Sequence, residues 1–160
     1  KVKGIDVNSA EGIDGLWMKD KNSVFYRGKK LEKISSNKFQ YFDGGISYDK
    51  ILIDKNGAYK LLESENQKDK IIPLDSKNID LKTLERFDTP IDGSNYFKDK
   101  NGVYFLNGEK FVKIDGADRD SFEVTMSGKY GKDKNNVYFE GKKMEGKNPI
   151  EFEEEMLEKE

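Results

Sequence analysis

Short stretches in which apolar and polar residues alternate run along the whole chain, separated by turns rich in Asp, Asn, Gly and Lys. Alternation with a period of two is typical of β-strands, and these turn residues favour hairpins. In one such stretch Val103 and Phe105 should face one side and Tyr104 and Leu106 the other, so both faces of the strand need cover. The pattern predicts a mainly β chain built from repeated antiparallel β-hairpin or meander units.

The turns are copies of one seven-residue word. It reads Asp-Lys-Asn-Gly-Val-Tyr-Phe from Asp99, and near-copies begin at Asp20, Asp54 and Asp133, so that the starts lie 34, 45 and 34 residues apart. These spacings predict a single repeat domain over residues 1–160, with a partial unit at 1–19 and units that start at residues 20, 54, 99 and 133.

Each unit carries further common features. A glycine turn follows the word in three copies, and Asn107-Gly108 is the strongest signal for a type I′ hairpin turn, ahead of Arg27-Gly28 and Glu140-Gly141. A polar loop then leads to an apolar anchor in each unit, namely Phe39, Leu84, Phe122 and Phe152. Since residues 3–11 match residues 115–123, the chain begins inside one unit and ends within another. Two arrangements stay open, an array of further units and a closed ring.

Two stretches depart from the strand pattern. Residues 80–87 fit a short helical turn capped by Asp80, and Asn148-Pro149 fits the start of a short C-terminal helix over residues 150–159. The extra residues of the second unit, at 63–70, read as an exposed hairpin tip or loop.

Composition excludes much chemistry. The chain has no Cys and no His, so thiol nucleophiles, His-based pairs, zinc sites of the usual ligands and disulfides are excluded. With 29 basic and 31 acidic residues interleaved along the chain, the net charge of −2 argues against nucleic acid as a partner. No apolar run approaches the roughly 20 residues of a transmembrane segment. We expect an exported or envelope-associated protein whose leader has been removed, since the chain starts without Met, and a cytoplasmic location stays open.

Carboxylates are the remaining candidates for site chemistry. The Asp-x-Asn pairs resemble the start of an EF-hand loop, but the sixth place from Asp54 is Tyr59 instead of Gly, and the twelfth from Asp99 is Lys110 instead of Glu. We interpret them as turn formers and leave open whether they bind a metal. Asp43 with Asp88, or the acids at 151–155, could form a hydrolytic pair, although Asp43 and Asp88 stand at equivalent turn positions. We therefore assign no catalytic, cofactor-binding or metal-ligating residue and expect no cofactor.

The aromatic side chains are expected mainly in the core, because the chain is poor in aliphatic residues. Trp17 and Tyr26 are the rings whose exposure would indicate a stacking platform for sugars or single-stranded nucleic acid.

The Asp-Lys-Asn-x-Val-Tyr-Phe word, its Gly-Lys-Lys-Met continuation at 141–144 and the Asp-x-x-Ser-Phe-Glu loop at 118–123 resemble the DKNYY repeat family of bacterial proteins. The resemblance covers most of residues 3–152, with Ala58 and Lys60 as departures in the second unit. It implies an exported or envelope protein, and it implies no activity, ligand or functional residue. We expect a non-catalytic binding or structural module of a bacterial cell envelope or exported protein, with a protein or polysaccharide partner. The alternatives are a cell-surface polysaccharide-binding module and a carboxylate-dependent hydrolase.

Overall fold

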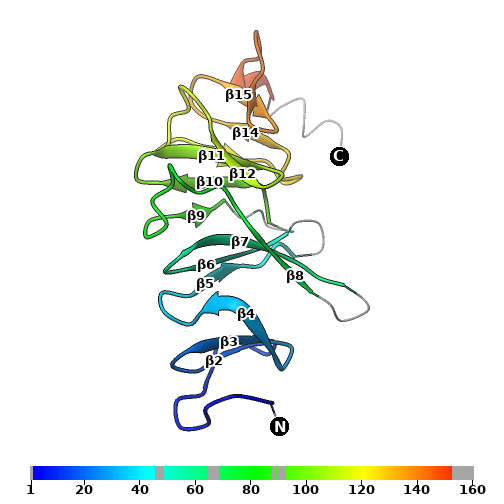
Figure 1. Ribbon diagram of the computed structural model, residues 1–160. Helices are drawn as coiled ribbons and strands as arrows, with labels where there is room; N and C mark the ends of the chain where they lie inside the picture. Colours follow the sequence, from blue (N-terminus) through cyan, green and yellow to red (C-terminus); the bar gives the residue numbers. More distant parts are fainter. Residues whose placement is uncertain (1, 46–48, 65–68, 88, 90–92, 153–160) are drawn as a thin grey trace. The chain divides into compact units, whose positions relative to one another are not determined.

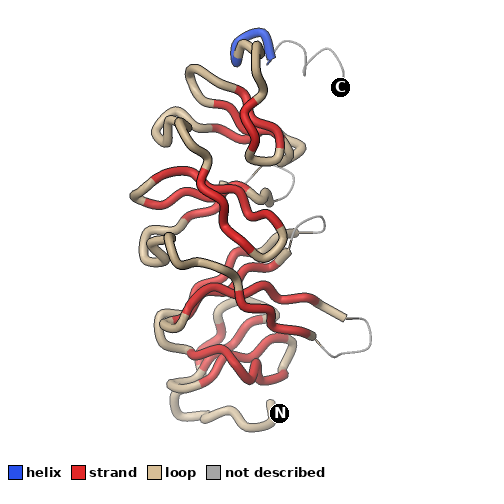
Figure 2. Tube along the Cα trace, turned by 45° about the horizontal axis from the view of Figure 1, so that its top comes forward, coloured by secondary structure: helices blue, strands red, loops and turns tan. Residues whose placement is uncertain are grey.

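The computed structural model describes residues 2–45, 49–64, 69–87, 89 and 93–152. In this part of the chain, sixteen strands form four antiparallel sheets of four strands, and the strand order in each sheet follows the sequence. The strands and their connecting loops can be followed along the trace in Figure 2. The prediction of mainly β meander units is confirmed. The chain divides into two units, Lys1–Phe42 with Lys50–Pro73 and Asp43–Asp49 with Leu74–Glu160, and each is described by itself.

The first unit contains two meanders, which we call the first and second repeats (Figure 1). The first repeat consists of β1 (Glu11–Gly12), β2 (Trp17–Lys19), β3 (Ser23–Tyr26) and β4 (Lys29–Ser35). The second repeat consists of β5 (Gln40–Phe42), β6 (Lys50–Asp54), β7 (Gly57–Leu62) and β8 (Lys70–Pro73).

The second unit contains the third and fourth repeats. The third consists of β9 (Glu85–Arg86), β10 (Tyr96–Asp99), β11 (Gly102–Asn107) and β12 (Lys110–Lys113). The fourth consists of β13 (Glu123–Val124), β14 (Tyr130–Lys132), β15 (Val137–Phe139) and β16 (Lys142–Lys143).

Every sheet is formed around one of the four aspartates that open the sequence word, which we call the repeat aspartates: Asp20, Asp54, Asp99 and Asp133. The second strand ends at or next to this residue, and the third strand returns antiparallel to the second. The first strand of each sheet precedes its repeat aspartate in the chain. Residues 11–12 therefore supply the edge strand of the first repeat.

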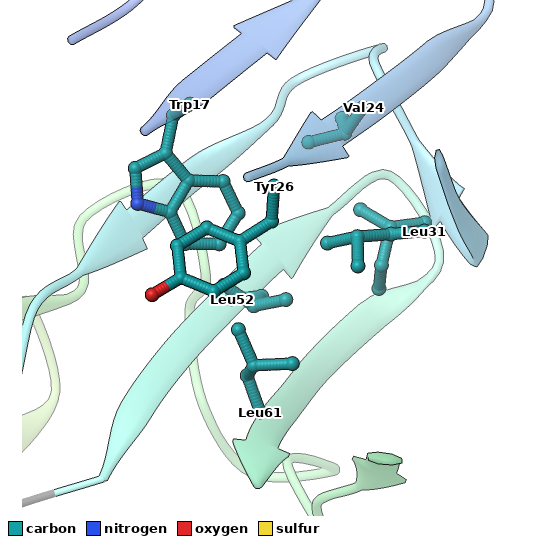
Figure 3. Packing of buried hydrophobic residues seen from close by; sticks show 7 residues of the cluster. Trp17, Val24, Tyr26, Leu31, Leu52 and Leu61 are labelled. Carbon is teal, nitrogen blue, oxygen red and sulfur yellow. The ribbon is translucent and has the colours of Figure 1, made fainter. Parts of the chain in front are cut away.

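Aromatic rings join consecutive repeats inside each unit. In the first unit, Trp17, Tyr26 and Leu31 of the first repeat pack with Leu52 and Leu61 of the second (Figure 3). In the second unit, the third and fourth repeats share a cluster of buried residues formed by Tyr96, Val103, Ile114, Phe122 and Tyr138. Aromatic side chains thus fill much of the core of a chain that is poor in aliphatic residues, as predicted.

One ring contact recurs between repeats. The aromatic residue three positions before a repeat aspartate lies against the anchor phenylalanine at the start of the next repeat. The ring centroids are 5.7 Å apart for Trp17–Phe39, 5.5 Å for Tyr96–Phe122 and 5.1 Å for Tyr130–Phe152. Phe152 is buried although only the start of its unit is described. The predicted anchors Phe39, Phe122 and Phe152 thus hold one repeat on the next.

The type I′ prediction is wrong for Asn107-Gly108. Arg27 and Gly28 both have positive φ, of 49° and 74°, as do Glu140 and Gly141, and this is the type I′ pattern. In the third repeat Asn107 pairs with Lys110 in the ladder, so the turn residues are Gly108 and Glu109, and of these Gly108 has a positive φ. Counted from the repeat aspartate, the strand before this turn ends two residues later than in the other two copies, whereas the Asn-Gly pair stands only one residue later, so the turn moves off this pair.

The two helical predictions have different outcomes. Asp80 caps a turn by accepting the backbone N–H of Lys82 at 3.0 Å, but residues 85–86 form the strand β9, so the helical reading of 80–87 is wrong. At the C-terminus a short helix begins at Pro149, and the side-chain oxygen of Asn148 accepts the N–H of Ile150 at 3.0 Å. The start of the predicted helix is confirmed, and residues 153–159 lie outside the described part.

The insertion at 63–70 lies between β7 and β8, as expected of a hairpin tip, and residues 65–68 fall outside the described part. Among the described residues, no helix has both the length and the apolar character needed to cross a bilayer.

Candidate functional site

The repeat aspartates fold the turns in which they stand. Asp99 is buried, and its Oδ1 accepts the backbone N–H groups of Asn101 at 2.7 Å and Gly102 at 3.1 Å. Asp20, Asp54 and Asp133 make the same two bonds to the residues two and three positions later. A carboxylate is suited to this position because it accepts several N–H groups at once. The interpretation as turn formers is confirmed.

The second carboxylate oxygen holds the loop that precedes the sheet. Oδ2 of Asp99 accepts the backbone N–H of Asp80 at 2.7 Å, and Oδ2 of Asp133 accepts that of Asp118 at 2.9 Å. The equivalent donors are Asp6 for Asp20, at 3.0 Å, and Ser35 for Asp54, at 2.8 Å. One buried side chain therefore connects a turn to a loop 14 to 19 residues earlier in the chain.

The lysine after the repeat aspartate fastens the same loop from outside. Nζ of Lys100 lies 2.5 Å from Oδ2 of Asp80, while the Lys100 backbone N–H donates to Oγ1 of Thr83 at 3.1 Å. Lys134 makes the same two contacts with Asp118 and Ser121, at 2.7 Å and 3.2 Å. Lys21 does so with Asp6 and Ser9 in the first repeat, at 2.8 Å and 3.2 Å.

A second ion pair lies beside each of these three turns. The lysine immediately before the repeat aspartate faces a glutamate on the first strand, with Nζ to Oε2 distances of 3.3 Å for Lys19–Glu11, 3.3 Å for Lys98–Glu85 and 3.6 Å for Lys132–Glu123. The glutamates are largely exposed, at 67% for Glu85 and 69% for Glu123. Ion pairs with one largely exposed partner add little stability.

These contacts set the acidity of the carboxyl groups. The Lys134 ammonium and the Ser121 hydroxyl lower the pKa of Asp118 to about 2. Burial alone would raise the pKa of Asp133, but N–H groups of Asp118 and Asn135 and the hydroxyl of Tyr138 hold it below its ordinary value. Both carboxylates are therefore ionised at neutral pH and already saturated with donors from the protein, unlike a general acid, which needs a raised pKa.

Among its described residues, the second repeat has no counterpart to these two ion pairs. Ser35 replaces the loop aspartate, and in the strand register Gln40 faces Ile53 where the other repeats pair Glu with Lys. The Lys55 N–H donates to the carbonyl of Asn37 at 3.1 Å instead of to a hydroxyl. The departure noted from sequence at Ala58 and Lys60 thus extends to the loop and the first strand.

The turn of the third repeat and the loop of the fourth enclose a groove of about 490 Å³, which we call groove A. On the side of the third repeat it is lined by Thr83, Glu85, Lys98, Asp99 and Lys100. The other side is formed by Arg119 and Asp120, with Phe122 at the base of the loop.

A groove of about 250 Å³, which we call groove B, lies at the equivalent place in the fourth repeat. The turn contributes the same five positions, occupied by Ser121, Glu123, Lys132, Asp133 and Lys134. The opposite side is formed by Pro149 and Ile150, which follow Asn148 as Arg119 and Asp120 follow Asp118. Two consecutive repeats thus present the same hydroxyl, carboxylate and ammonium groups toward a groove.

Of the acidic residues considered for catalysis, Asp43 and Glu151 lie in the described part of the chain. Asp43 is exposed and its Oδ1 accepts the N–H of Gly45 at 3.1 Å, while Asp88 and residues 153–155 lie outside the described part. Within the described ranges, no three acidic side chains are grouped closely enough to hold a metal ion. Trp17 and Tyr26 are fully buried, so these two rings form no exposed platform.

Sequence reasoning did not find the grooves or the Glu–Lys pairs. A signal was present, because a hydroxyl residue followed two positions later by Glu occurs in Ser9-Ala10-Glu11, Thr83-Leu84-Glu85 and Ser121-Phe122-Glu123. The position of Arg119 opposite Lys98 had no signal, since it depends on how one sheet packs on the next.

A protein-family model described as DKNYY family matches residues 1–63 and 105–159. These residues make up more than half of the chain, and the resemblance inferred from the repeat word is confirmed. No curated protein and no solved structure matches the chain.

Proposed function

The chain belongs to the DKNYY family, and we propose that it is a non-catalytic module that binds an extended partner along the grooves beside the turns of its repeats. The observation that carries the proposal is the recurrence of the same five groove positions in grooves A and B. Repeat proteins present equivalent side chains at regular intervals, which suits a long partner better than a small molecule.

A non-catalytic role is supported by the state of the carboxylates. Asp99 and Asp133 line the grooves, but each is buried and bonded to backbone N–H groups of its turn and loop. These two groups act as structural acceptors, whereas an acid and base for hydrolysis must face a shared substrate across a cleft.

Partner binding is supported by the exposed charges at the groove rims. Glu85 and Glu123 are paired with lysines yet remain mostly open to solvent. Exposed pairs of this kind exchange partners at small cost, because solvent screens them in the unbound protein.

The cellular setting that we propose is the envelope of a bacterium or its exterior. This rests on the family resemblance. Fractionation of the source cells tests it, and recovery of the protein in the cytosol alone would overturn it.

Capture with the full chain as bait tests the binding role. We expect a saturable partner from the envelope fraction, retained by the wild type and lost in the double variant E85K/E123K, which reverses one exposed charge in each groove. The matched control is E109K/E145K, which has the same net charge change on exposed residues that line neither groove.

Equal retention by both variants would overturn the groove as the binding site, and capture of nothing would overturn the binding role. Saturating turnover of a defined substrate that is lost on replacing a single carboxylate would instead establish an enzyme.

A further inference from the structure

Two loop positions vary from repeat to repeat, whereas outside the second repeat the residues around them are similar. The loop before each sheet starts with Asp or Asn in four of five copies. Four of the five copies have an anchor four positions after this start, namely Phe39, Leu84, Phe122 and Phe152. The second and third loop positions lie between these and read Val7-Asn8, Ser36-Asn37, Leu81-Lys82, Arg119-Asp120 and Pro149-Ile150. We call them the variable pairs.

The variable pairs face the grooves where grooves are described. Arg119 and Asp120 form the far side of groove A, and Pro149 and Ile150 form the far side of groove B. Ile150 is 72% exposed and Pro149 is half-buried, so this pair lies outside the buried core. By contrast the neighbouring anchors Phe122 and Phe152 are buried.

The five turn positions carry the same kinds of side chain in grooves A and B, and the variable pair on the opposite side differs between them. Groove A combines its two lysines with the guanidinium of Arg119 and the carboxylate of Asp120, which lie 2.9 Å apart. Groove B combines the equivalent lysines with an apolar surface. A charged or polar side chain therefore fits groove A, and an apolar side chain with a polar backbone fits groove B.

The difference between the pairs identifies the class of partner. A homopolymeric glycan presents the same groups at every repeat, so it would match the same residues in every loop. Pairs that differ in charge and hydropathy match a chain whose units differ, as the residues of a polypeptide do. Resting on the proposed binding function, we infer that the partner is an extended polypeptide and that the variable pairs determine its sequence.

The spacing of the sheets defines the register of that polypeptide. Sheets packed face to face lie about 10 Å apart, and an extended chain rises about 3.3 Å per residue. Consecutive grooves therefore receive side chains about three residues apart, with a charged or polar residue in groove A and an apolar residue in groove B.

Selection from a library of random twelve-residue peptides on the immobilised full chain tests the inference. The enriched peptides should share a charged or polar residue and an apolar residue three positions apart. The variant I150D should remove the apolar preference while keeping the charged one, and R119E should reverse the sign of the charge preferred in groove A. At least a tenfold change in relative enrichment is expected for each.

The control is V7D, because Val7 is the equivalent exposed loop residue of the first repeat, at 78% exposure, and lines neither groove. It should leave both preferences unchanged. Peptides that share no such pair of positions, preferences that survive I150D and R119E, or no enriched peptide would each overturn the inference.

Failure of the proposed function gives a different result. If E85K/E123K abolishes capture while the loop variants leave selectivity unchanged, the grooves bind a partner and the inference about the variable pairs is wrong. If E85K/E123K has no effect on capture, the proposed function itself is wrong.

Discussion

The hydroxyl oxygen of Tyr96 lies 3.0 Å from the backbone nitrogen of Gly141, so a side chain of the third repeat accepts a hydrogen bond from the hairpin turn of the fourth. The same hydroxyl donates to the carbonyl of Lys129 at 3.1 Å. Tyr96 is fully buried and its ring also packs on Phe122. One residue therefore joins the two repeats through both polar and apolar contacts.

Replacing Tyr96 by Phe should lower the free energy of unfolding by about 1–3 kcal/mol, because the N–H of Gly141 loses its partner and the carbonyl of Lys129 keeps only the N–H of Glu140, while the ring packing is kept. Urea denaturation measures the change. The matched control is Tyr130→Phe, at the equivalent position of the fourth repeat, where no described residue hydrogen-bonds to the hydroxyl. A control as destabilising as Tyr96→Phe would contradict the explanation.

Asp133→Asn should destabilise the protein by about 1–3 kcal/mol for each donor left unsatisfied. One oxygen of Asp133 accepts the N–H groups of Asn135 and Asn136, and the other accepts the N–H of Asp118 and the hydroxyl of Tyr138, all at 2.8–2.9 Å. Asn replaces one of these oxygens by an amide nitrogen, which accepts neither of its two donors. Asp115→Asn, at an exposed position, should change stability by less than about 0.5 kcal/mol. Equal stability of both variants would show that the repeat aspartates are dispensable to the turn.

Stability should fall in acid as the loop aspartates are protonated. The pKa of Asp118 lies at about 2 in the folded protein because of Lys134 and Ser121, against an ordinary value of 3.8. A lowered pKa stabilises the fold fully above pH 4, and the contribution is lost as the pH falls toward 2. Urea midpoints measured at pH 7, 4, 3 and 2 should therefore decline, and Asp118→Asn should decline less steeply between pH 4 and 2. Parallel curves for the two proteins would exclude this role of Asp118.

Much of the fold could be predicted from sequence because each hairpin is local. Asp99, Asn101 and Gly102 are close in the chain, and the bonds that form their turn depend only on residue type and spacing. The turn at Asn107-Gly108 was mispredicted because the strand before it extends two residues further than in the other copies, which changes the residues that form the turn. Residues 80–87 were misread because pairing of Arg86 with Phe97 outweighs the local helical preference.

The grooves could not be predicted because they depend on contacts between repeats. Lys98 and Arg119 line groove A from two different repeats, and the packing of Tyr96 on Phe122 brings these repeats together. Residue type predicted Asp80 as a cap, but its ion pair with Lys100 connects positions 20 residues apart in the chain. The variable pairs lie in a loop outside the seven-residue word, so the word alone does not show which loop positions face a groove.

Gly131 should be intolerant of even a methyl group, because a Cβ atom built there would lie 2.4 Å from Cζ of Phe122. Gly131 stands in β14 without a positive φ, so alanine strains no backbone angle and the effect is purely steric. We expect Gly131→Ala to cost about 1–3 kcal/mol in urea denaturation, as overpacking does elsewhere. Gly12→Ala is the control, since Gly12 also lies in a strand and a Cβ atom added to it would meet no described heavy atom within 4 Å.

A double-mutant cycle separates the clash from any other effect of Gly131→Ala. Phe122→Leu shortens the side chain that the new methyl group meets, so the alanine should cost less in this background than in the wild type, with a coupling energy of about 0.5–3 kcal/mol. If the cost of Gly131→Ala is the same in both backgrounds, Phe122 is not the residue that excludes the side chain. If the cost falls, the anchor phenylalanine of one loop and the glycine of the adjacent strand form a matched pair. Since the loop of groove A ends at Phe122, this pair also fixes the position of Arg119 and Asp120 at the groove.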